Sequence, residues 1–331
     1  MELCVKVESD PGRQLITVDL RDNCDCLPCG LNLTESTART SAMIGVFTGL
    51  GQVVPPNAGS FRRVEVHLRE GCVVGIPRHQ YSCSAATTNL AALVANLVTG
   101  AIAELGEGCG MAAAGRSQPP SCAVISGSDP RDDDAPYVNQ LMLAATGGPG
   151  GPRADGWVTM LGIGSAGFLL RDSVEIDEMK YPIRVIEQRV LIDSEGAGRR
   201  RGSPAAYVEF GPVDCSMDVV YLSDGTYNAP VGVRGGWNGS CAQQRQRFTD
   251  GSESDELGPF ARLLLKPGES IISVCCSGAG YGPPREREIG RVLGDVEAGL
   301  VSRSRASDVY GVVIDADGKV DAAATARSRN G

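Results

Sequence analysis

The part of the sequence that most constrains the fold is residues 275–311, which begin where an apolar strand runs into glycines and prolines. The strand is Ser270–Val274, and residues 277–280 after it (Ser-Gly-Ala-Gly) carry little side-chain bulk. Their backbone is free to adopt positive φ angles and to approach a neighbouring segment closely. Pro283 and Pro284 then exclude a helix until the next residue. We therefore predict a strand that leads into a tightly packed backbone crossing.

A short helix is predicted beyond the prolines. Apolar residues recur there at the spacing of one helix face, at Ile289, Val292, Leu293 and Val296. Gly299 follows them and is a typical helix stop. Residues 309–314 are predicted to close the unit as a strand, because they are mainly β-branched and aromatic.

The composition favours a strand-rich fold along the whole chain. Glycine accounts for 43 of the 331 residues, nearly twice its usual share of about 7%. With six Phe and two Trp, the core must be built mostly from Val, Leu, Ile and Ala. These properties predict an α+β fold with many strands and glycine turns. One long helix is expected near residues 87–105, and it is expected to be buried because it is apolar nearly all round.

The order of the predicted elements indicates one unit with internal parts. The unit is expected to span residues 1–331. Its sub-parts are expected at 1–125 and 126–314, followed by a C-terminal hairpin and helix at 315–331. In the first part, a hairpin over residues 2–20 precedes a helix over residues 34–50, for which Thr34 is the expected N-cap.

The charge of the chain excludes two classes of partner. It has 31 basic and 40 acidic residues, and its net charge of −9 argues against binding to nucleic acid or to an anionic membrane surface. No apolar run reaches the roughly 18 residues of a membrane span. The first residues, Met1–Val7, read as a strand and lack the layout of a signal peptide. We expect a cytoplasmic protein.

Six of the twelve cysteines are expected to be buried free thiols, because free cysteine behaves as a small apolar residue; they are Cys4, Cys72, Cys83, Cys109, Cys122 and Cys215. Cys24, Cys26 and Cys29 form the one close cluster, and three thiolates could converge on Zn²⁺ if a fourth ligand came from elsewhere. A cysteine-rich loop without metal is the favoured interpretation. Structural roles are also favoured for the two histidines, His67 and His79.

Residues 199–201 are three consecutive arginines that follow a glycine turn. They could bind an anionic intermediate through bidentate hydrogen bonds. They could equally form a structural node of ion pairs with Glu175 and Glu178, and we favour this second interpretation. The glycine run 147–151 lacks the Lys-Ser/Thr pair of a phosphate-binding loop, so no nucleotide site is predicted in this chain.

Several segments together resemble motifs of the hydantoinase B family, which includes the alpha-type subunit of acetone carboxylase. The matching segments are 175–178, 182–185, 193–202, 280–284, 295–302 and 310–312, with a Pro-x-Asn-x-Gly turn at 55–59. The resemblance covers roughly residues 10–327. The chain departs from the family where consecutive glycines are usual, because Cys275, Cys276, Ser277 and Ala279 stand there instead.

The resemblance implies a hydantoinase B-like fold and a place in a hetero-oligomer. Family members are usually longer, and this chain corresponds to their second half, whereas their metal-binding His and Asp residues lie in the first. The implied partners are hydantoinase A-like, ATP-binding subunits and a small additional subunit. ATP and Mg²⁺ would be bound on those partners, and biotin would not be used. The resemblance does not decide whether zinc is bound elsewhere in the complex.

The resemblance also implies the class of reaction. The first expectation is ATP-dependent carboxylation of a ketone, with acetophenone, bicarbonate and ATP giving benzoylacetate; the chain has the size of the small (gamma) subunit of such a carboxylase. The alternative is a subunit of an ATP-dependent hydantoinase, oxoprolinase or lactamase. A further alternative is a non-catalytic scaffold subunit.

The candidate site residues follow from these motifs. Arg199, Arg201 and Glu178 are the first candidates, as an anion-holding or structural node near the active cavity. Tyr281 and the loop 276–282 are the second, as cavity lining.

Overall fold

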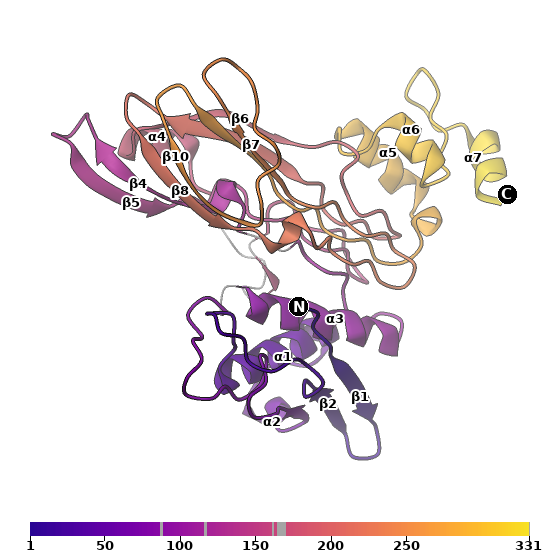
Figure 1. Cartoon of the computed structure of the whole chain (residues 1–331). Helices are drawn as coiled ribbons and strands as arrows, with labels where there is room; N and C mark the ends of the chain where they lie inside the picture. Colours follow the sequence, from indigo (N-terminus) through magenta and orange to yellow (C-terminus); the bar gives the residue numbers. More distant parts are fainter. Residues whose placement is uncertain (87–88, 116–117, 161, 164–169, 331) are drawn as a thin grey trace.

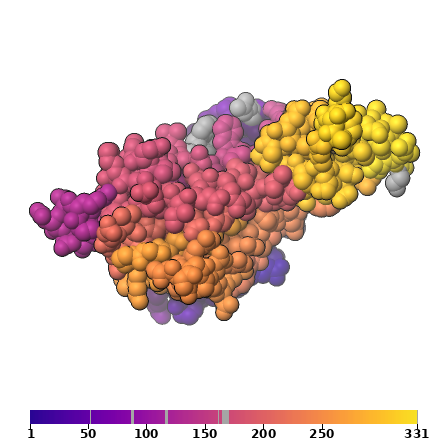
Figure 2. All heavy atoms as spheres, turned by 90° about the horizontal axis from the view of Figure 1, so that it is seen from above, coloured from indigo at the N-terminus to yellow at the C-terminus, as the bar shows by residue number. Residues whose placement is uncertain are grey.

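The computed structural model describes residues 1–86, 89–115, 118–160, 162–163 and 170–330. Figure 1 shows an N-terminal unit below a β-sandwich, with a group of C-terminal helices at one end of the sandwich. Figure 2 shows that the molecule is elongated, with the segment around residues 124–140 at one end and the C-terminal helices at the other. The α+β fold predicted from the sequence is confirmed.

The N-terminal unit combines a three-stranded sheet with two packed helices. Its sheet has the order β1-β2-β3, in which β1 (Lys6–Asp10) is antiparallel to β2 (Leu15–Asp19) and β3 (Val64–His67) is parallel to β2. The main helices are α1 (Glu35–Leu50) and α3 (Leu90–Leu105). The smaller elements are the 3-10 turn η1 (Gly51–Val53) and α2 (Ala58–Phe61).

The packing of α1 against α3 depends on a glycine. A Cβ atom added at Gly45 would lie 2.6 Å from the Cβ of Val98 and 2.8 Å from the Ala95 carbonyl oxygen, so only glycine allows this approach.

The predicted N-cap of α1 is confirmed, because the Thr34 side chain accepts a hydrogen bond from the Thr37 N–H. The predicted helix near 87–105 begins at Leu90 in the described residues; residues 87 and 88 lie outside them.

The central part is a sandwich of two antiparallel four-stranded sheets. The first has the order β10-β8-β4-β5, with β10 at Phe260–Leu265, β8 at Met217–Leu222, β4 at Val124–Asp129 and β5 at Ala135–Gln140. The second has the order β6-β7-β11-β9, with β6 at Ile183–Val190, β7 at Ala206–Pro212, β11 at Ser270–Val274 and β9 at Gln243–Arg247. The two sheets share one core, to which the first contributes Ile125 and Val219 and the second contributes Phe210 and Ile271.

Short helical elements border the sandwich. They are η2 (Pro120–Cys122), α4 (Val174–Lys180) and η4 (Asp224–Thr226). The sequence analysis did not predict α4. Seven residues are too few for a clear apolar period, although Ser173 caps the helix by accepting a hydrogen bond from the Ile176 N–H.

Glycine-rich segments leave the sandwich side by side and are joined by backbone hydrogen bonds. Gly147 N–H donates to Cys276 O at 2.8 Å, and Gly150 N–H donates to Ala279 O at 2.8 Å. A Cβ atom added at Gly278 would lie 1.7 Å from the Gly148 carbonyl oxygen. The close backbone crossing predicted for residues 277–280 is therefore confirmed, and it has the glycine run 147–151 as a neighbour.

The C-terminal helices form a third, smaller core. They are η5 (Pro284–Glu286), α5 (Ile289–Glu297), α6 (Arg303–Asp308) and α7 (Ala322–Asn330). The predicted helix after the prolines is thus confirmed, and Gly299 beyond it has a φ of +69°. The predicted closing strand over 309–314 is wrong. Tyr310 and Val312 instead pack beside the helices with Val292, so their apolar character reflects burial and not pairing in a sheet.

Among the residues that the structure describes, no helix has the length and apolar character needed to cross a membrane.

Candidate functional site

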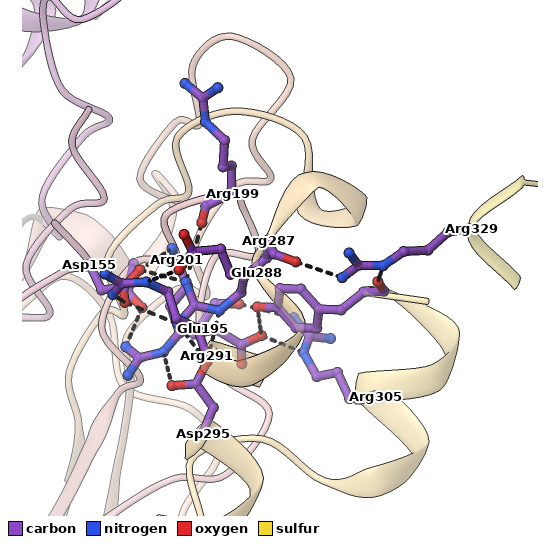
Figure 3. A network of polar contacts seen from close by, with 12 residues as sticks. Asp155, Glu195, Arg199, Arg201, Arg287, Glu288, Arg291, Asp295, Arg305 and Arg329 are labelled. Atoms are coloured by element: carbon purple, nitrogen blue, oxygen red, sulfur yellow. Dashed lines mark hydrogen bonds and ion pairs between the residues drawn. The ribbon is translucent and has the colours of Figure 1, made fainter. Parts of the chain in front are cut away.

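A buried network of charges lies where the glycine-rich segments meet the C-terminal helices (Figure 3). At its centre is Arg287, whose side chain is 1% exposed. Its guanidinium is 2.6 Å from an Asp155 carboxylate oxygen and 2.7 Å from an Asp295 carboxylate oxygen. Two carboxylates thus hold one buried guanidinium, which is the arrangement that makes a buried arginine tolerable.

Arg201 shares the same two carboxylates. Its Nε lies 2.9 Å from Asp295 Oδ1, and its backbone N–H donates to Asp155 Oδ1 at 3.0 Å. Burial opposes ionisation of Asp155, but the hydrogen bonds and charges of Arg287 and Arg201 outweigh it and hold the pKa of this carboxyl below its usual value. The Asp155 carboxylate therefore stays ionised, and its contacts connect the loop at 155, Arg201 and the segment that begins α5.

A second buried carboxylate, Glu195, belongs to the glycine turn before the arginines. Its Oε1 accepts hydrogen bonds from Arg305 Nε at 2.7 Å and from the Tyr310 hydroxyl at 2.8 Å. Burial raises the pKa of Glu195 although Arg305 opposes the shift, and burial together with the Glu195 charge raises the pKa of Tyr310. Glu195 Oε2 has no hydrogen-bond partner within the described part of the chain.

Of the three arginines expected to form a node, only Arg201 belongs to the buried network, and its acidic partners differ from those expected. Glu178 Oε1 accepts a hydrogen bond from the Val185 N–H at 2.8 Å and lies 3.5 Å from Arg184, beside the sandwich. Glu175 is on α4 with it and accepts a hydrogen bond from Ser173. The expected pairing of the arginine run with Glu175 and Glu178 is therefore wrong, because Glu178 contacts β6 and Glu175 is exposed on α4.

The three arginines of the run have different surroundings. Arg199 points away from the buried network (Figure 3), and its guanidinium lies 3.2 Å from Glu107 and 3.7 Å from Glu286. Arg200 pairs through its backbone with Tyr281, and its Nε is buried with no hydrogen-bond partner in the described residues. Arg201 is 7% exposed and belongs wholly to the network. The run is thus a set of separate structural contacts.

Tyr281 is fully buried, and its hydroxyl donates to the Cys109 carbonyl oxygen at 3.0 Å. Burial raises its pKa. At the start of the same loop, Cys276 donates its Sγ hydrogen to the Gly225 carbonyl oxygen at 3.4 Å. Within this chain, the loop 276–282 therefore lies in the interior, where Tyr281 does not face solvent.

The cysteine cluster does not form a metal centre in the described residues. Cys24 and Cys29 are exposed, whereas Cys26 is buried and donates its Sγ hydrogen to the Cys72 carbonyl oxygen at 3.4 Å. Across the described part of the chain, no three His, Cys, Asp or Glu side chains are placed to hold a metal ion.

A cleft of about 500 Å³ lies between the N-terminal unit and the sandwich. Its walls are mainly apolar and include Leu93 and Leu97 of α3 on one side and Leu222 and Pro259 on the other. Asp224 and Asn228 also line the cleft. The sequence analysis did not find this site, because the two sides come from elements far apart in the chain.

The same architecture, in which an N-terminal α+β unit is joined to a two-sheet sandwich and a group of C-terminal helices, is found in enzymes of known structure. The chain belongs to the hydantoinase B/oxoprolinase family, which matches residues 1–284. The beta chain of the caprolactamase of Pseudomonas jessenii is 33% identical over 297 residues, which are 86% of this chain and 50% of that protein. A putative D-/L-hydantoinase component of the B type, from Pseudomonas sp. strain NS671, is 27% identical over 157 residues, or 45% of this chain and 25% of that protein.

Two solved structures have the same fold. The ATP-dependent caprolactamase from Pseudomonas jessenii superposes with a TM-score of 0.83 at 26% identity, over 100% of this chain and 57% of that chain. The nucleotide-free acetone carboxylase superposes with a TM-score of 0.76 at 17% identity, over 98% of this chain and 47% of that chain, which shows the likeness of fold alone. The chain spans about half the length of the caprolactamase chain. The predicted hydantoinase B-like fold is confirmed.

Proposed function

We propose that this chain forms about half of a hydantoinase B-type unit in an ATP-dependent complex that opens cyclic amides. The observation that carries the proposal is the 33% identity to a caprolactamase chain over 297 residues. Superposition of the whole chain on the ATP-dependent caprolactamase, with a TM-score of 0.83, supports it. Cyclic amide hydrolysis, the second expectation from the sequence, therefore becomes the first.

The role proposed for this chain is to build the frame of the unit. The buried arginines and carboxylates at its centre are committed to one another, with contacts of 2.6–3.0 Å among Arg287, Asp155, Asp295 and Arg201. A group held in this way is poorly placed to bind and release a substrate. The partners proposed for the chain are a hydantoinase A-like subunit that binds ATP and Mg²⁺ and a small further subunit.

Carboxylation of a ketone is the second candidate function. The fold shared with acetone carboxylase, at a TM-score of 0.76, favours it. In this version the substrate is acetone or an aromatic ketone such as acetophenone, and the chain is the small subunit of the carboxylase. Both candidate reactions consume ATP on a carbonyl compound, so the same complex can be tested for both.

The test is to purify the native complex that contains this chain and to measure substrate-dependent ATP hydrolysis. Caprolactam, hydantoin and 5-oxoproline form one set, and acetone and acetophenone with labelled bicarbonate form the other. ATP hydrolysis coupled to ring opening, with no label fixed, is expected. Label entering a β-keto acid would establish the carboxylase instead, and a complex that hydrolyses ATP with neither set would contradict both candidates.

A further inference from the structure

Arg200 differs from the other arginines whose side chains are half-buried or buried. Among the residues that the structure describes, each of the others donates at least one hydrogen bond from its guanidinium. Within the same residues, the guanidinium of Arg200 makes neither a hydrogen bond nor an ion pair. The positions outside the described ranges hold no Asp or Glu, so none of their side chains supplies a carboxylate.

The position of the Arg200 guanidinium makes the missing partner costly. Its Nε is fully buried, whereas its terminal nitrogens reach the surface. A buried donor without an acceptor loses its hydration without compensation. Both neighbours in the run have carboxylate partners. Arg199 lies 3.2 Å from Glu107. Arg201 lies 2.9 Å from Asp295. The chain thus supplies carboxylates on either side of Arg200, and the charge of Arg200 is left for a group from outside the chain.

The backbone of Arg200 is held firmly in the glycine-rich crossing. Its N–H donates to the Tyr281 carbonyl oxygen at 3.0 Å, and its own carbonyl oxygen accepts from the Tyr281 N–H at 2.9 Å. A Cβ atom added at Gly150 would lie 2.3 Å from the Arg200 carbonyl oxygen, so the run 147–151 packs directly on this residue. Folding therefore fixes the base of the side chain before any ligand arrives, which lowers the entropy lost on binding.

The accessible edge of the guanidinium indicates the chemistry of the ligand. Because Nε is buried, a ligand meets the two terminal nitrogens, whose N–H groups form a planar fork. Such a fork matches two oxygens of a carboxylate or a phosphate. Partial burial strengthens the attraction, because the surrounding dielectric constant is lower than that of water. We propose that Arg200 is an anion-binding residue whose ligand is a small molecule that carries a carboxylate or a phosphate group.

The choice of ligand rests on the function proposed above. Opening a cyclic amide gives a carboxylic acid, and hydrolysis of ATP gives phosphate, so the proposed reaction supplies both kinds of anion. Arg201 and Arg287 are occupied by Asp155 and Asp295 and serve the frame. Arg200 is assigned a binding contact with the anion and takes no part in a bond-making step.

The test is isothermal titration calorimetry of the native complex without ATP, with 6-aminohexanoate and inorganic phosphate as the two probes. At least one probe is expected to bind the wild type. Arg200→Gln should lower its affinity by about tenfold or more, because charge-assisted hydrogen bonds are lost. Arg200→Lys keeps the charge without the planar fork, and its affinity should lie between the two. The probe whose affinity falls identifies the bound group as a carboxylate or a phosphate.

Arg153→Gln is the matched control. Arg153 is exposed, also makes no side-chain hydrogen bond in the described residues, and should bind both probes like the wild type when substituted. Arg200→Gln is expected to melt near the wild-type temperature, since no contact within the chain is lost. Equal affinities of Arg200→Gln and the wild type, or no binding of either probe, would overturn the proposal. Loss of assembled complex with unchanged anion affinity would overturn it too, and would indicate a carboxylate on a partner chain. Because binding is measured without turnover, this result is separate from that of the ring-opening assay.

Discussion

The guanidinium of Arg287 and the carboxylate of Asp295 lie 2.7 Å apart, with only 1% and 8% of their side chains exposed. They are eight residues apart in the chain, and α5 begins between them. Asp295 also accepts a hydrogen bond from Arg201, so this single carboxylate joins the glycine turn to the C-terminal helices. The network is thus the joint between two parts of the fold.

Removing one partner of this pair is expected to be costly. In Arg287→Met, Asp155 and Asp295 lose a buried counter-charge, and breaking a buried pair in this way typically costs about 3–5 kcal/mol. The free energy of unfolding, measured with urea, should fall by that order. Arg262→Met is the matched control, because Arg262 pairs with Asp218 on an exposed surface and should change stability little. Equal effects of the two variants would contradict the role given to Arg287.

Arg199 and Arg201 are expected to respond differently to the same substitution. Arg201→Ala empties a buried position beside Asp295 and is expected to lower the melting temperature and the yield of assembled complex. Arg199→Ala removes only contacts with Glu107 and Glu286 at the surface, and its melting temperature should stay near that of the wild type. Melting curves of the two variants, measured side by side, check this. If Arg199→Ala melted as early as Arg201→Ala, the division between the two arginines would be wrong.

The sequence was informative where one local rule decides the structure. Thr34 caps a helix, Pro284 delays one, and Gly278 permits a backbone crossing, and each outcome depends on residues close by in the chain. The composition predicted the α+β fold, and the dispersed motifs predicted the likeness to hydantoinase B. These are the parts of the structure that could be predicted.

The partners of the charges could not be predicted, because they depend on distant contacts. Arg201 meets Asp295 from 94 positions away, and no local pattern distinguishes Asp295 from the nearer Glu178 as its partner. The prediction of a strand at residues 309–314 was wrong for a related reason. β-branched and aromatic residues indicate burial, but whether Tyr310 and Val312 pair in a sheet or pack beside helices depends on what surrounds them.

Asp177 is predicted to make stability depend on pH. Burial, followed by the nearby Asp172 carboxyl, raises its pKa from 3.8 to about 6, while Lys180 opposes the shift. The folded chain therefore keeps this proton to a higher pH than the unfolded chain, so stability falls as pH rises from about 4 to about 6. Asp177→Asn removes this loss and should be more stable relative to the wild type at pH 7 than at pH 4.

Urea unfolding of both proteins at the two pH values is the measurement. Asp132→Asn, in an exposed loop, is the control and should shift stability equally at both. A difference between Asp177→Asn and the wild type that did not change with pH would show that the Asp177 carboxyl does not hold its proton in the folded chain.

Two glycines are predicted to respond to alanine with opposite signs. In Gly278→Ala, the new Cβ would sit 1.7 Å from the Gly148 carbonyl oxygen, which the backbone hydrogen bonds of the crossing hold in place. Forcing an atom into such a site costs about 1–3 kcal/mol or more. In Gly294→Ala, the Cβ meets no atom within 4 Å, inside α5. Alanine there should stabilise the protein by roughly 0.5–1 kcal/mol, because glycine loses more backbone freedom on folding. Unfolding free energies of the two variants measure both effects, and a Gly278→Ala protein as stable as the wild type would mean that the glycine-rich segments are not closely packed.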